Sequence, residues 1–402
     1  MQAPRPRRAL ENLPPPDRHG GDAADAQVLV QALECAARGP DESLTHGFHA
    51  YPARMHPQIA RTVLQAWARP EVRLLDPFCG SGTVLVEGMC VLARGTGVDL
   101  NPLALRLSEI KCSLRDETTR ARFVERLEQV VSASRQRVRG RVRVRAPLGP
   151  AERQWYEPHV LAELGGLHAE IANVKPKTDR RALQMVLSAI VVKFSRQRAE
   201  TSTEKVEKRI GKGIVTDFFD RKARELVGRW EELAESCAGA SSPVLLEGDA
   251  TRLEYVLPRQ RFDLVVSSPP YGGTYDYAAH HERRLPWLGI ESRRLRQREI
   301  GSRRKLSGRE AAEAVRTWDR EVAAMLSSIA SVLDPDAMCV LLIGDGDLGG
   351  RRVDAEEQLR RLAPSAGLEL RAWASAPRLD WRGQKPRHEH LLLLRPVRSA
   401  GG

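Results

Sequence analysis

The chain lacks the features that mark secreted, disulfide-stapled and membrane proteins. It has 402 residues but only six Cys, and none of these forms a Cys-x-x-Cys pair, so neither a disulfide framework nor a zinc ribbon is indicated. No apolar run approaches the roughly 20 residues that a membrane helix requires, and no apolar stretch follows the basic start of the chain, as it would in a secretory signal. We therefore expect a reduced, soluble protein of the cytoplasm that makes no membrane contact.

Acidic residues are in deficit, and this imbalance indicates a class of partner. Lys and Arg total 64 against 52 Asp and Glu, which gives a formal net charge of +12 and an isoelectric point near 9.7. Such a surface favours a polyanionic partner over an acidic protein or a neutral metabolite. Hydrophobic residues make up 42% of the chain, which is enough for real cores and excludes disorder throughout.

Short apolar runs divide the chain into three parts. Residues 1–26 are rich in Pro, Arg, Gly and Asp and predict a disordered leader. Residues 27–113 and 243–398 alternate strands with helices, which is typical of a parallel sheet, and residues 114–242 predict a basic helical insertion. The expected strands are 72–75, 96–99, 244–246, 262–266, 338–343 and 391–394, and the expected helices outside the insertion include 83–93, 102–113, 308–333 and 354–366.

A glycine-rich loop follows the first of these strands. It reads Asp76-Pro77-Phe78-Cys79-Gly80-Ser81-Gly82-Thr83 and opens a helix, so its backbone can approach a ligand closely. The loop lacks the Lys of a P-loop and the Gly-x-Gly-x-x-Gly spacing of dinucleotide-binding proteins, which disfavours ATP and NAD. Asp99 ends the next strand about 20 residues later, where an acid binds ribose hydroxyls in such sheets.

A second motif, Ser268-Pro269-Pro270-Tyr271, ends the strand expected at 262–266. Its two Pro residues have no amide hydrogens, so their carbonyl oxygens act purely as acceptors beside a Ser hydroxyl and a Tyr ring. A planar ring that bears an amino group suits this arrangement, because the amine hydrogens and the ring face both find partners.

Together, the two motifs resemble those of the amino-methyltransferases, which use S-adenosylmethionine to methylate exocyclic amines of nucleobases. Within that family Ser-Pro-Pro-Tyr is typical of cytosine N4 enzymes and Asp-Pro-Pro-Tyr of adenine N6 enzymes. The stretch at 46–57, His-Gly-Phe-His-Ala-Tyr-Pro-Ala-Arg-Met-His-Pro, is similar to the family's motif upstream of the loop. The resemblance covers residues 44–112 and 243–395. It implies a Rossmann-like class I methyltransferase fold, with a mostly parallel seven-stranded sheet whose last strand is antiparallel.

The resemblance also implies roles for individual residues. The loop would hold the methionine part of the cofactor, Asp99 the ribose, and Asp249 would lie near the adenine. Ser268 and the Pro269 carbonyl would accept the amine hydrogens, while Tyr271 stacks on the target base. The implied cofactor-binding residues are Tyr51, Asp76, Phe78, Gly80, Gly82, Thr83, Asp99, Asn101 and Asp249, and the implied catalytic residues are Ser268, Pro269, Pro270 and Tyr271.

Basic residues follow the Ser-Pro-Pro-Tyr motif directly, so we expect them on the catalytic side of the sheet, where they would bind nucleic acid. The predicted contacts are Arg283, Arg284, Arg293, Arg294, Arg303 and Arg304, with Arg296, Arg298 and Lys305 in the same run. The insertion at 114–242 is the expected target-recognition region.

No metal site is predicted. The stretches 280–282 and 388–390 contain His and Glu, but neighbouring residues on a strand point to opposite faces and zinc spacing is missing. We interpret 388–390 as the start of a last, antiparallel edge strand and 344–350 as a turn rather than a calcium loop. Cys79 is interpreted as a small loop residue and not a nucleophile.

Three functions remain open from the sequence. The favoured one is a DNA methyltransferase acting on cytosine N4, with adenine N6 as a variant. The second is a tRNA guanosine N2-methyltransferase, for which RNA replaces DNA. The third is a catalytically silent nucleic-acid-binding protein with the same fold. A role in restriction-modification, and a partner restriction endonuclease, are left undecided.

Overall fold

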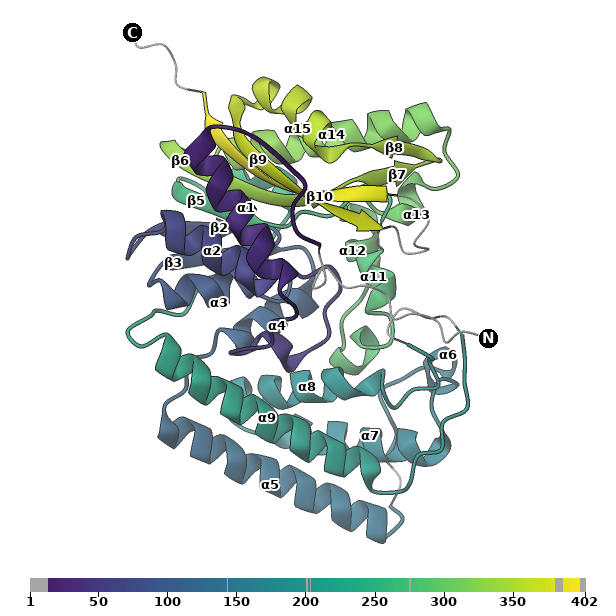
Figure 1. Ribbon diagram of the computed structural model, residues 1–402. Helices are drawn as coiled ribbons and strands as arrows, with labels where there is room; N and C mark the ends of the chain where they lie inside the picture. Colours follow the sequence, from purple (N-terminus) through teal and green to yellow (C-terminus); the bar gives the residue numbers. More distant parts are fainter. Residues whose placement is uncertain are drawn as a thin grey trace.

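An eight-stranded sheet forms the centre of the molecule (Figure 1). The structure is a computed structural model, and it describes residues 14–142, 144–199, 202, 204–274, 276–379 and 386–397. The strand order is β1-β9-β10-β6-β5-β2-β3-β4. These strands span Arg18–Gly21 (β1), Arg73–Asp76 (β2), Arg94–Asp99 (β3), Val244–Glu247 (β4), Phe262–Ser267 (β5), Leu333–Gly344 (β6), Leu368–Leu379 (β9) and Pro386–Pro396 (β10).

The five strands β4, β3, β2, β5 and β6 run parallel to one another. Strand β10 is antiparallel to both of its neighbours, β6 and β9. This arrangement confirms the predicted α/β, Rossmann-like class with an antiparallel last strand. The prediction of an edge position for that strand is wrong, because β10 lies inside the sheet. The sheet also has one strand more than the predicted seven, since β1 pairs with β9 at the edge.

Helices cover both faces of the sheet, because its central strands are apolar on both sides. Leu74 and Val266 pack with α1 (Ala23–Ala37), α2 (Pro57–Trp67) and α3 (Thr83–Cys90). Their neighbours Leu75 and Val265 point to the other face. There they pack with α10 (Leu253–Val256), α14 (Ala311–Ala330) and α15 (Ala355–Leu362).

Helices of the predicted insertion gather below the sheet in Figure 1. They are α5 (Glu117–Arg139), α6 (Pro150–Arg153), α7 (Pro158–Asn173), α8 (Lys177–Val191) and α9 (Ile214–Ser236). Their core is continuous with α4 (Pro102–Lys111) and with the 3-10 helix η3 (Leu285–Leu288). In addition, Trp230 of α9 donates its indole hydrogen to the Ile110 carbonyl at 2.8 Å. The insertion therefore packs closely on α4 and η3, while the two faces of the sheet have hydrophobic clusters of their own.

Short elements complete the chain and lie mostly around the carboxyl edge of the parallel strands. They are η1 (His46–Phe48), η2 (Ala250–Arg252), α11 (Tyr277–His280), α12 (Arg293–Arg298), α13 (Arg303–Leu306), β7 (Gly346–Leu348), β8 (Arg351–Val353) and η4 (Ala363–Ala366). No helix among the described residues is both long and apolar enough to cross a membrane.

The leader predicted at 1–26 needs correction at its carboxyl end. Residues 1–13 lie outside the described part of the chain, but β1 and the start of α1 fall within 18–26. Asp22 accepts hydrogen bonds from the amides of Ala24 and Asp25 and so caps α1. Composition alone missed these elements, because the pairing partner of β1 is more than 300 residues away in sequence.

A buried carboxylate in the helical insertion provides a test of this packing. Asp179 pairs with Arg115 and with Arg126, each at 2.7 Å, and its side chain is only 3% exposed. The Asp179→Ala variant would leave the Arg115 charge buried without a partner, so we expect the free energy of unfolding to fall by about 3 kcal/mol. Denaturant unfolding measures the change.

The matched control is Asp217→Ala in the same insertion. Asp217 pairs with Arg135 at 3.0 Å, but both side chains are about half exposed. We expect this variant to lose less than about 1 kcal/mol. Equal losses of unfolding free energy in the two variants would contradict the prediction that the buried pair stabilises the fold more than the exposed pair.

Candidate active site

A cavity opens at the carboxyl ends of β2, β3, β4 and β5, the edge at which ligands bind in open α/β sheets. It encloses about 890 Å³, including its open mouth. Asp76 ends β2, Asp99 ends β3, Asp249 follows β4 and Ser268 follows β5, and all four line the cavity. The parallel pairing of these strands thus brings together motifs that are far apart in sequence.

The glycine-rich loop forms one wall. Gly80 has a φ of +50°, and a Cβ atom there would lie 3.2 Å from the Tyr51 ring, so the ring packs closely on the bare backbone. Cys79 is buried, and burial raises the pKa of its thiol well above the ordinary value, which agrees with its interpretation as a small loop residue. Of the predicted cofactor-binding residues, Tyr51, Asp76, Phe78, Gly80, Thr83, Asp99, Asn101 and Asp249 line the cavity.

Gly82 is the exception among these residues. It caps the start of α3 with a φ of +82°, and a Cβ atom there would meet the Ser108 hydroxyl at 2.9 Å. Gly82 therefore lies behind the loop, where it allows α3 and α4 to approach each other. Gly82 does not line the cavity, and its contact with the cofactor stays a prediction.

Two carboxylates face the cavity without a positive partner. Asp76 accepts hydrogen bonds from Ser267 Oγ at 2.6 Å and from the Phe78 amide at 3.2 Å. Asp99 accepts from the amides of Gly80 and Asn101, both at 2.8 Å. Among the described residues, no ion pair involves either acid. Burial raises the pKa of Asp76 to about 7 and that of Asp99 to about 6.

Three polar atoms on the cavity wall are buried and accept or donate no hydrogen bond among the described residues. They are Thr83 Oγ1, Asn101 Nδ2 and Ser268 Oγ. A buried polar atom costs free energy unless it is hydrogen-bonded, so these atoms suit a polar ligand. Together with the two unpaired carboxylates and the bare backbone at Gly80, they fit S-adenosylmethionine, which carries an amino cation, a sulfonium and a ribose.

The Ser-Pro-Pro-Tyr motif lines the cavity only in part. Ser268 and Pro270 line the cavity, whereas Pro269 is buried behind them. Tyr271 is 2% exposed and lies outside the cavity wall. Its hydroxyl donates to Glu389 of β10 at 2.5 Å, and the Arg378 guanidinium lies over its ring at 5.5 Å. The predicted stacking of Tyr271 on the target base is therefore wrong in this arrangement, because the ring anchors the loop to β10.

The predicted basic residues fall into two groups. Arg293, Arg303 and Arg304 are exposed, and Arg298 both is exposed and lines the cavity, while the side chain of Arg294 lies outside the described residues. By contrast, Arg284 is 1% exposed and donates through Nε to the Ser188 carbonyl at 3.2 Å. Its predicted nucleic-acid contact is wrong, because the side chain holds α8 of the insertion against the segment after the motif.

Arg283 is also engaged with the protein itself. Its guanidinium lies 3.8 Å from the ring centre of Trp155 and pairs with Glu282 at 3.4 Å. Sequence reasoning also missed a cavity residue in this region, Glu299. The run of basic residues between 293 and 305 indicated the region, but a single Glu within it gave no signal of its own.

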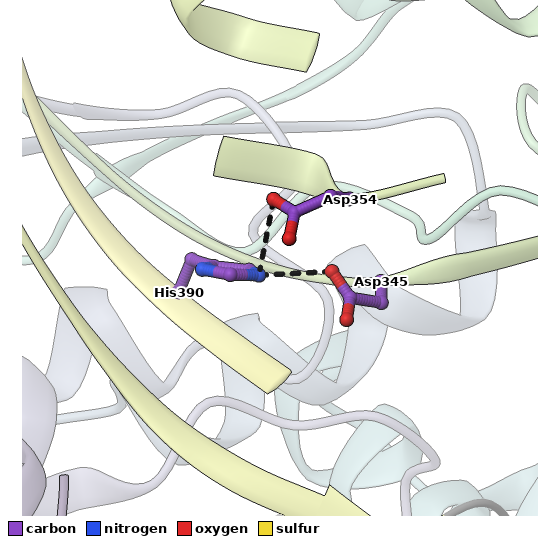
Figure 2. Close-up of side chains that lie close together, drawn as sticks. All are labelled: Asp345, Asp354 and His390. Carbon is purple, nitrogen blue, oxygen red and sulfur yellow. Dashed lines mark hydrogen bonds and ion pairs between the residues drawn. The ribbon is translucent and has the colours of Figure 1, made fainter. Parts of the chain in front are cut away.

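Asp345, Asp354 and His390 converge near the carboxyl end of β6 (Figure 2). His390 Nε2 lies 2.9 Å from Asp345 Oδ1, and His390 Nδ1 lies 2.8 Å from the Ser375 hydroxyl. Asp345 also accepts from Arg352 and from the His388 amide. These groups could hold a metal ion, but they already satisfy one another and tie β10 to the end of β6.

The stretch predicted as a turn at 344–350 contains β7, which pairs with β8.

The raised pKa values predict how ligand binding depends on pH. Ionised Asp76 attracts the ammonium group of S-adenosylhomocysteine and ionised Asp99 is the stronger acceptor for its ribose hydroxyls, so the affinity for this ligand should rise by about tenfold from pH 5.5 to pH 8. Calorimetric titration measures this, and Asp76→Asn should bind more weakly with a flatter pH dependence. An affinity that is the same at both pH values would contradict the prediction.

The stability of the ligand-free protein should change with pH in the opposite sense to the ligand affinity. The pKa of Asp76 lies above its ordinary value of 3.8 in the folded state, so its contribution to stability is present at low pH and is lost as the pH rises through about 7. Asp76→Asn should therefore lose less stability than the wild type between pH 5 and pH 8.

The chain is similar in sequence to known methyltransferases. Residues 48–139 match a family model described as RMKL-like, methyltransferase domain. The chain is 27% identical over 269 residues to the Type II methyltransferase M.MvaI of Kocuria varians, covering 62% of this chain and 59% of that protein. It is 32% identical over 71 residues to the Type II methyltransferase M.MjaII of Methanocaldococcus jannaschii, covering 18% and 13%. The chain thus spans less than two thirds of each of these relatives.

Among solved structures, TrmN from Thermus thermophilus aligns with a TM-score of 0.31 and 14% identity, over 85% of this chain and 49% of that one. The rRNA methyltransferase aviRa from Streptomyces viridochromogenes aligns with a TM-score of 0.33 and 15% identity, over 87% and 89%. The strand order of this chain, rather than these low scores, defines its fold. In sequence, this chain is thus similar to an RMKL-like methyltransferase domain and to two Type II methyltransferases, and its strand order is that of a Rossmann-like α/β sheet.

Proposed function

We propose that this protein transfers a methyl group from S-adenosylmethionine to the exocyclic amine of a DNA base, and that the base is cytosine and the acceptor N4. The observation that carries the proposal is one shared cavity. It is lined by the acids Asp76 and Asp99, here called the donor wall, and by Ser268 and Pro270, here called the acceptor wall. Donor and acceptor can therefore meet in a single enclosed space.

The residues of the donor wall would bind the cofactor and orient it. Asp76 would hold the amino cation of the cofactor, Asp99 the ribose hydroxyls, and Asp249 would lie near the adenine. When bound, S-adenosylmethionine supplies an electrophilic methyl group on its sulfonium. The Ser267 hydroxyl donates to Asp76, and this bond keeps the acid oriented toward the cavity.

The residues on the acceptor side make the amine a better nucleophile. The lone pair of an aromatic amine is delocalised into the ring, so the flat amine attacks poorly. If Ser268 Oγ and the Pro269 carbonyl accept the two amine hydrogens, they favour a more pyramidal nitrogen whose lone pair points at the methyl group. Ser268 lines the cavity, and its Oγ forms no well-aligned hydrogen bond within the described part of the chain.

DNA is the proposed polymer for two reasons. The relatives with sequence similarity are named Type II methyltransferases, and exposed basic side chains at Arg293, Arg298, Arg303 and Arg304 flank the cavity segment. A base in a duplex must swing out of the helix to reach such a cavity, and basic residues would hold the phosphates on either side. The insertion at 114–242, which contacts this segment through Arg284, is the proposed target-recognition region.

Substitutions at two adjacent serines distinguish the binding of the cofactor from the transfer of the methyl group. Ser268→Ala should lower kcat roughly 100-fold and leave the affinity for S-adenosylhomocysteine unchanged, because only the amine contact is lost. Ser267→Ala should instead weaken that affinity, because Asp76 loses its hydroxyl partner. Calorimetry and single-turnover methylation measure the two effects. Weakened binding in Ser268→Ala, with normal kcat, would contradict the assignment of the two walls.

The product identifies the substrate directly. The protein is incubated with tritiated S-adenosylmethionine and either unmethylated phage DNA or unmodified tRNA, and the labelled nucleosides are separated by mass spectrometry. We expect N4-methylcytosine from DNA. Label in N6-methyladenine would change the target base, label in N2-methylguanosine from tRNA would establish the RNA alternative, and absence of label despite cofactor binding would indicate a catalytically silent protein.

A further inference from the structure

Glu299 is a buried carboxyl group in the cavity that the mechanism above does not use. It lies just after α12 and is 6% exposed. It lines the same cavity as Ser268 and Pro270. A buried acid that faces a cavity is costly unless it binds something there, so its function requires an explanation.

Hydrogen bonds tie the segment around Glu299 to the residues that follow the Ser-Pro-Pro-Tyr motif. The Gly273 amide donates to the Gly301 carbonyl at 2.9 Å, and the Ser302 hydroxyl donates to Asp276 at 2.6 Å. Because Gly273 and Asp276 follow shortly after the Ser-Pro-Pro-Tyr motif, these bonds connect the segment that carries Glu299 to the chain that leaves the motif, and both Glu299 and Ser268 line the same cavity.

One half of the carboxyl group is already engaged and the other half is available. Glu299 Oε1 accepts from the Tyr277 amide at 2.5 Å, whereas Oε2 accepts no hydrogen bond from any described residue. The charged groups around it are Asp276, Arg304 and Lys305, and no ion pair to Glu299 occurs among the described residues. Burial raises the pKa of Glu299 to about 7, with a further rise from Asp276.

We propose that Glu299 is a specificity-determining residue, whose Oε2 hydroxyl donates a hydrogen bond to the ring nitrogen beside the reactive amine of the target base. The inference rests on the proposed function, in which Ser268 and the Pro269 carbonyl bind the amine itself. Cytosine N3 and adenine N1 are acceptors at this position, so both suit a protonated carboxyl. Guanine carries an N–H at N1 beside its amine, so a guanine that presents this edge would oppose the donor and leave two hydrogens facing each other; its acceptor N3 lies on the other side of the amine.

The first test compares two substitutions under saturating S-adenosylmethionine, using the DNA site found in the product analysis. Glu299→Gln keeps an acceptor for Tyr277 and places an NH₂ donor where Oε2 lies, so kcat/KM for DNA should stay within about threefold of the wild type near pH 6. Glu299→Ala should lower kcat/KM for DNA at least tenfold, with the KM for the cofactor unchanged.

The dependence on pH separates a donor from a structural role. Wild-type kcat/KM for DNA should fall as the pH rises through about 7, because the carboxyl loses its proton, whereas Glu299→Gln should stay flat. Glu321→Gln is the matched control, since Glu321 accepts from the Gly301 amide at 2.7 Å in the same segment but does not line the cavity. It should follow the wild-type profile. If kcat/KM of Glu299→Gln falls with rising pH as that of the wild type does, the proposal is overturned.

A modified base provides the decisive measurement. A duplex with 3-deazacytosine at the target position, or 1-deazaadenine if adenine is the target, lacks the ring acceptor. The wild type should lose at least tenfold in kcat/KM on this duplex, and Glu299→Ala should lose no more than about twofold relative to its own activity on the normal duplex. Equal losses in both proteins would overturn the role of Glu299 while DNA methylation itself still stands. Wild-type labelling of guanosine in tRNA would overturn both proposals.

Discussion

A buried hydrogen bond between two neighbouring strand ends is the contact on which the site depends. Ser267 Oγ at the end of β5 donates to Asp76 at the end of β2, at 2.6 Å. The two strands are parallel neighbours in the sheet, so the loops that follow them must leave from the same edge. The bond fixes the position of the two loops relative to each other. It therefore also fixes the distance between the donor wall and the acceptor wall of the cavity.

The helical insertion contributes to the site through packing as well as through any contact with nucleic acid. Its apolar side chains share one core with α4 and η3, and α4 begins directly after the Asp99 turn. Arg284 adds a buried polar contact between α8 and the segment that carries Tyr277 and Glu299. Movement of the insertion would therefore shift the acceptor wall, which offers a physical route by which target recognition could be linked to the position of the base.

Burial gives the cavity an unusual set of acids. Asp76, Asp99 and Glu299 all have raised pKa values, and burial is the main cause in each case. On the donor wall a cationic ligand favours the ionised form of Asp76 and Asp99, whereas on the acceptor wall the proposed contact requires Glu299 to keep its proton. Burial therefore raises the pKa on both walls, but the donor wall binds its cationic ligand in the ionised form, whereas the acceptor wall would bind the uncharged base in the protonated form.

The sequence alone determined the sheet class, the glycine-rich loop and the position of Ser268, because these depend on local patterns: apolar runs, glycines and prolines at strand ends. It could not reveal β1, whose pairing with β9 joins distant parts of the chain. It misjudged Tyr271 and Arg284, since an aromatic ring or a guanidinium has the same sequence signature whether it faces a ligand or the interior. Only tertiary packing, with Glu389 beside Tyr271 and the Ser188 carbonyl beside Arg284, decided that these side chains are buried and that Glu299 lines the cavity.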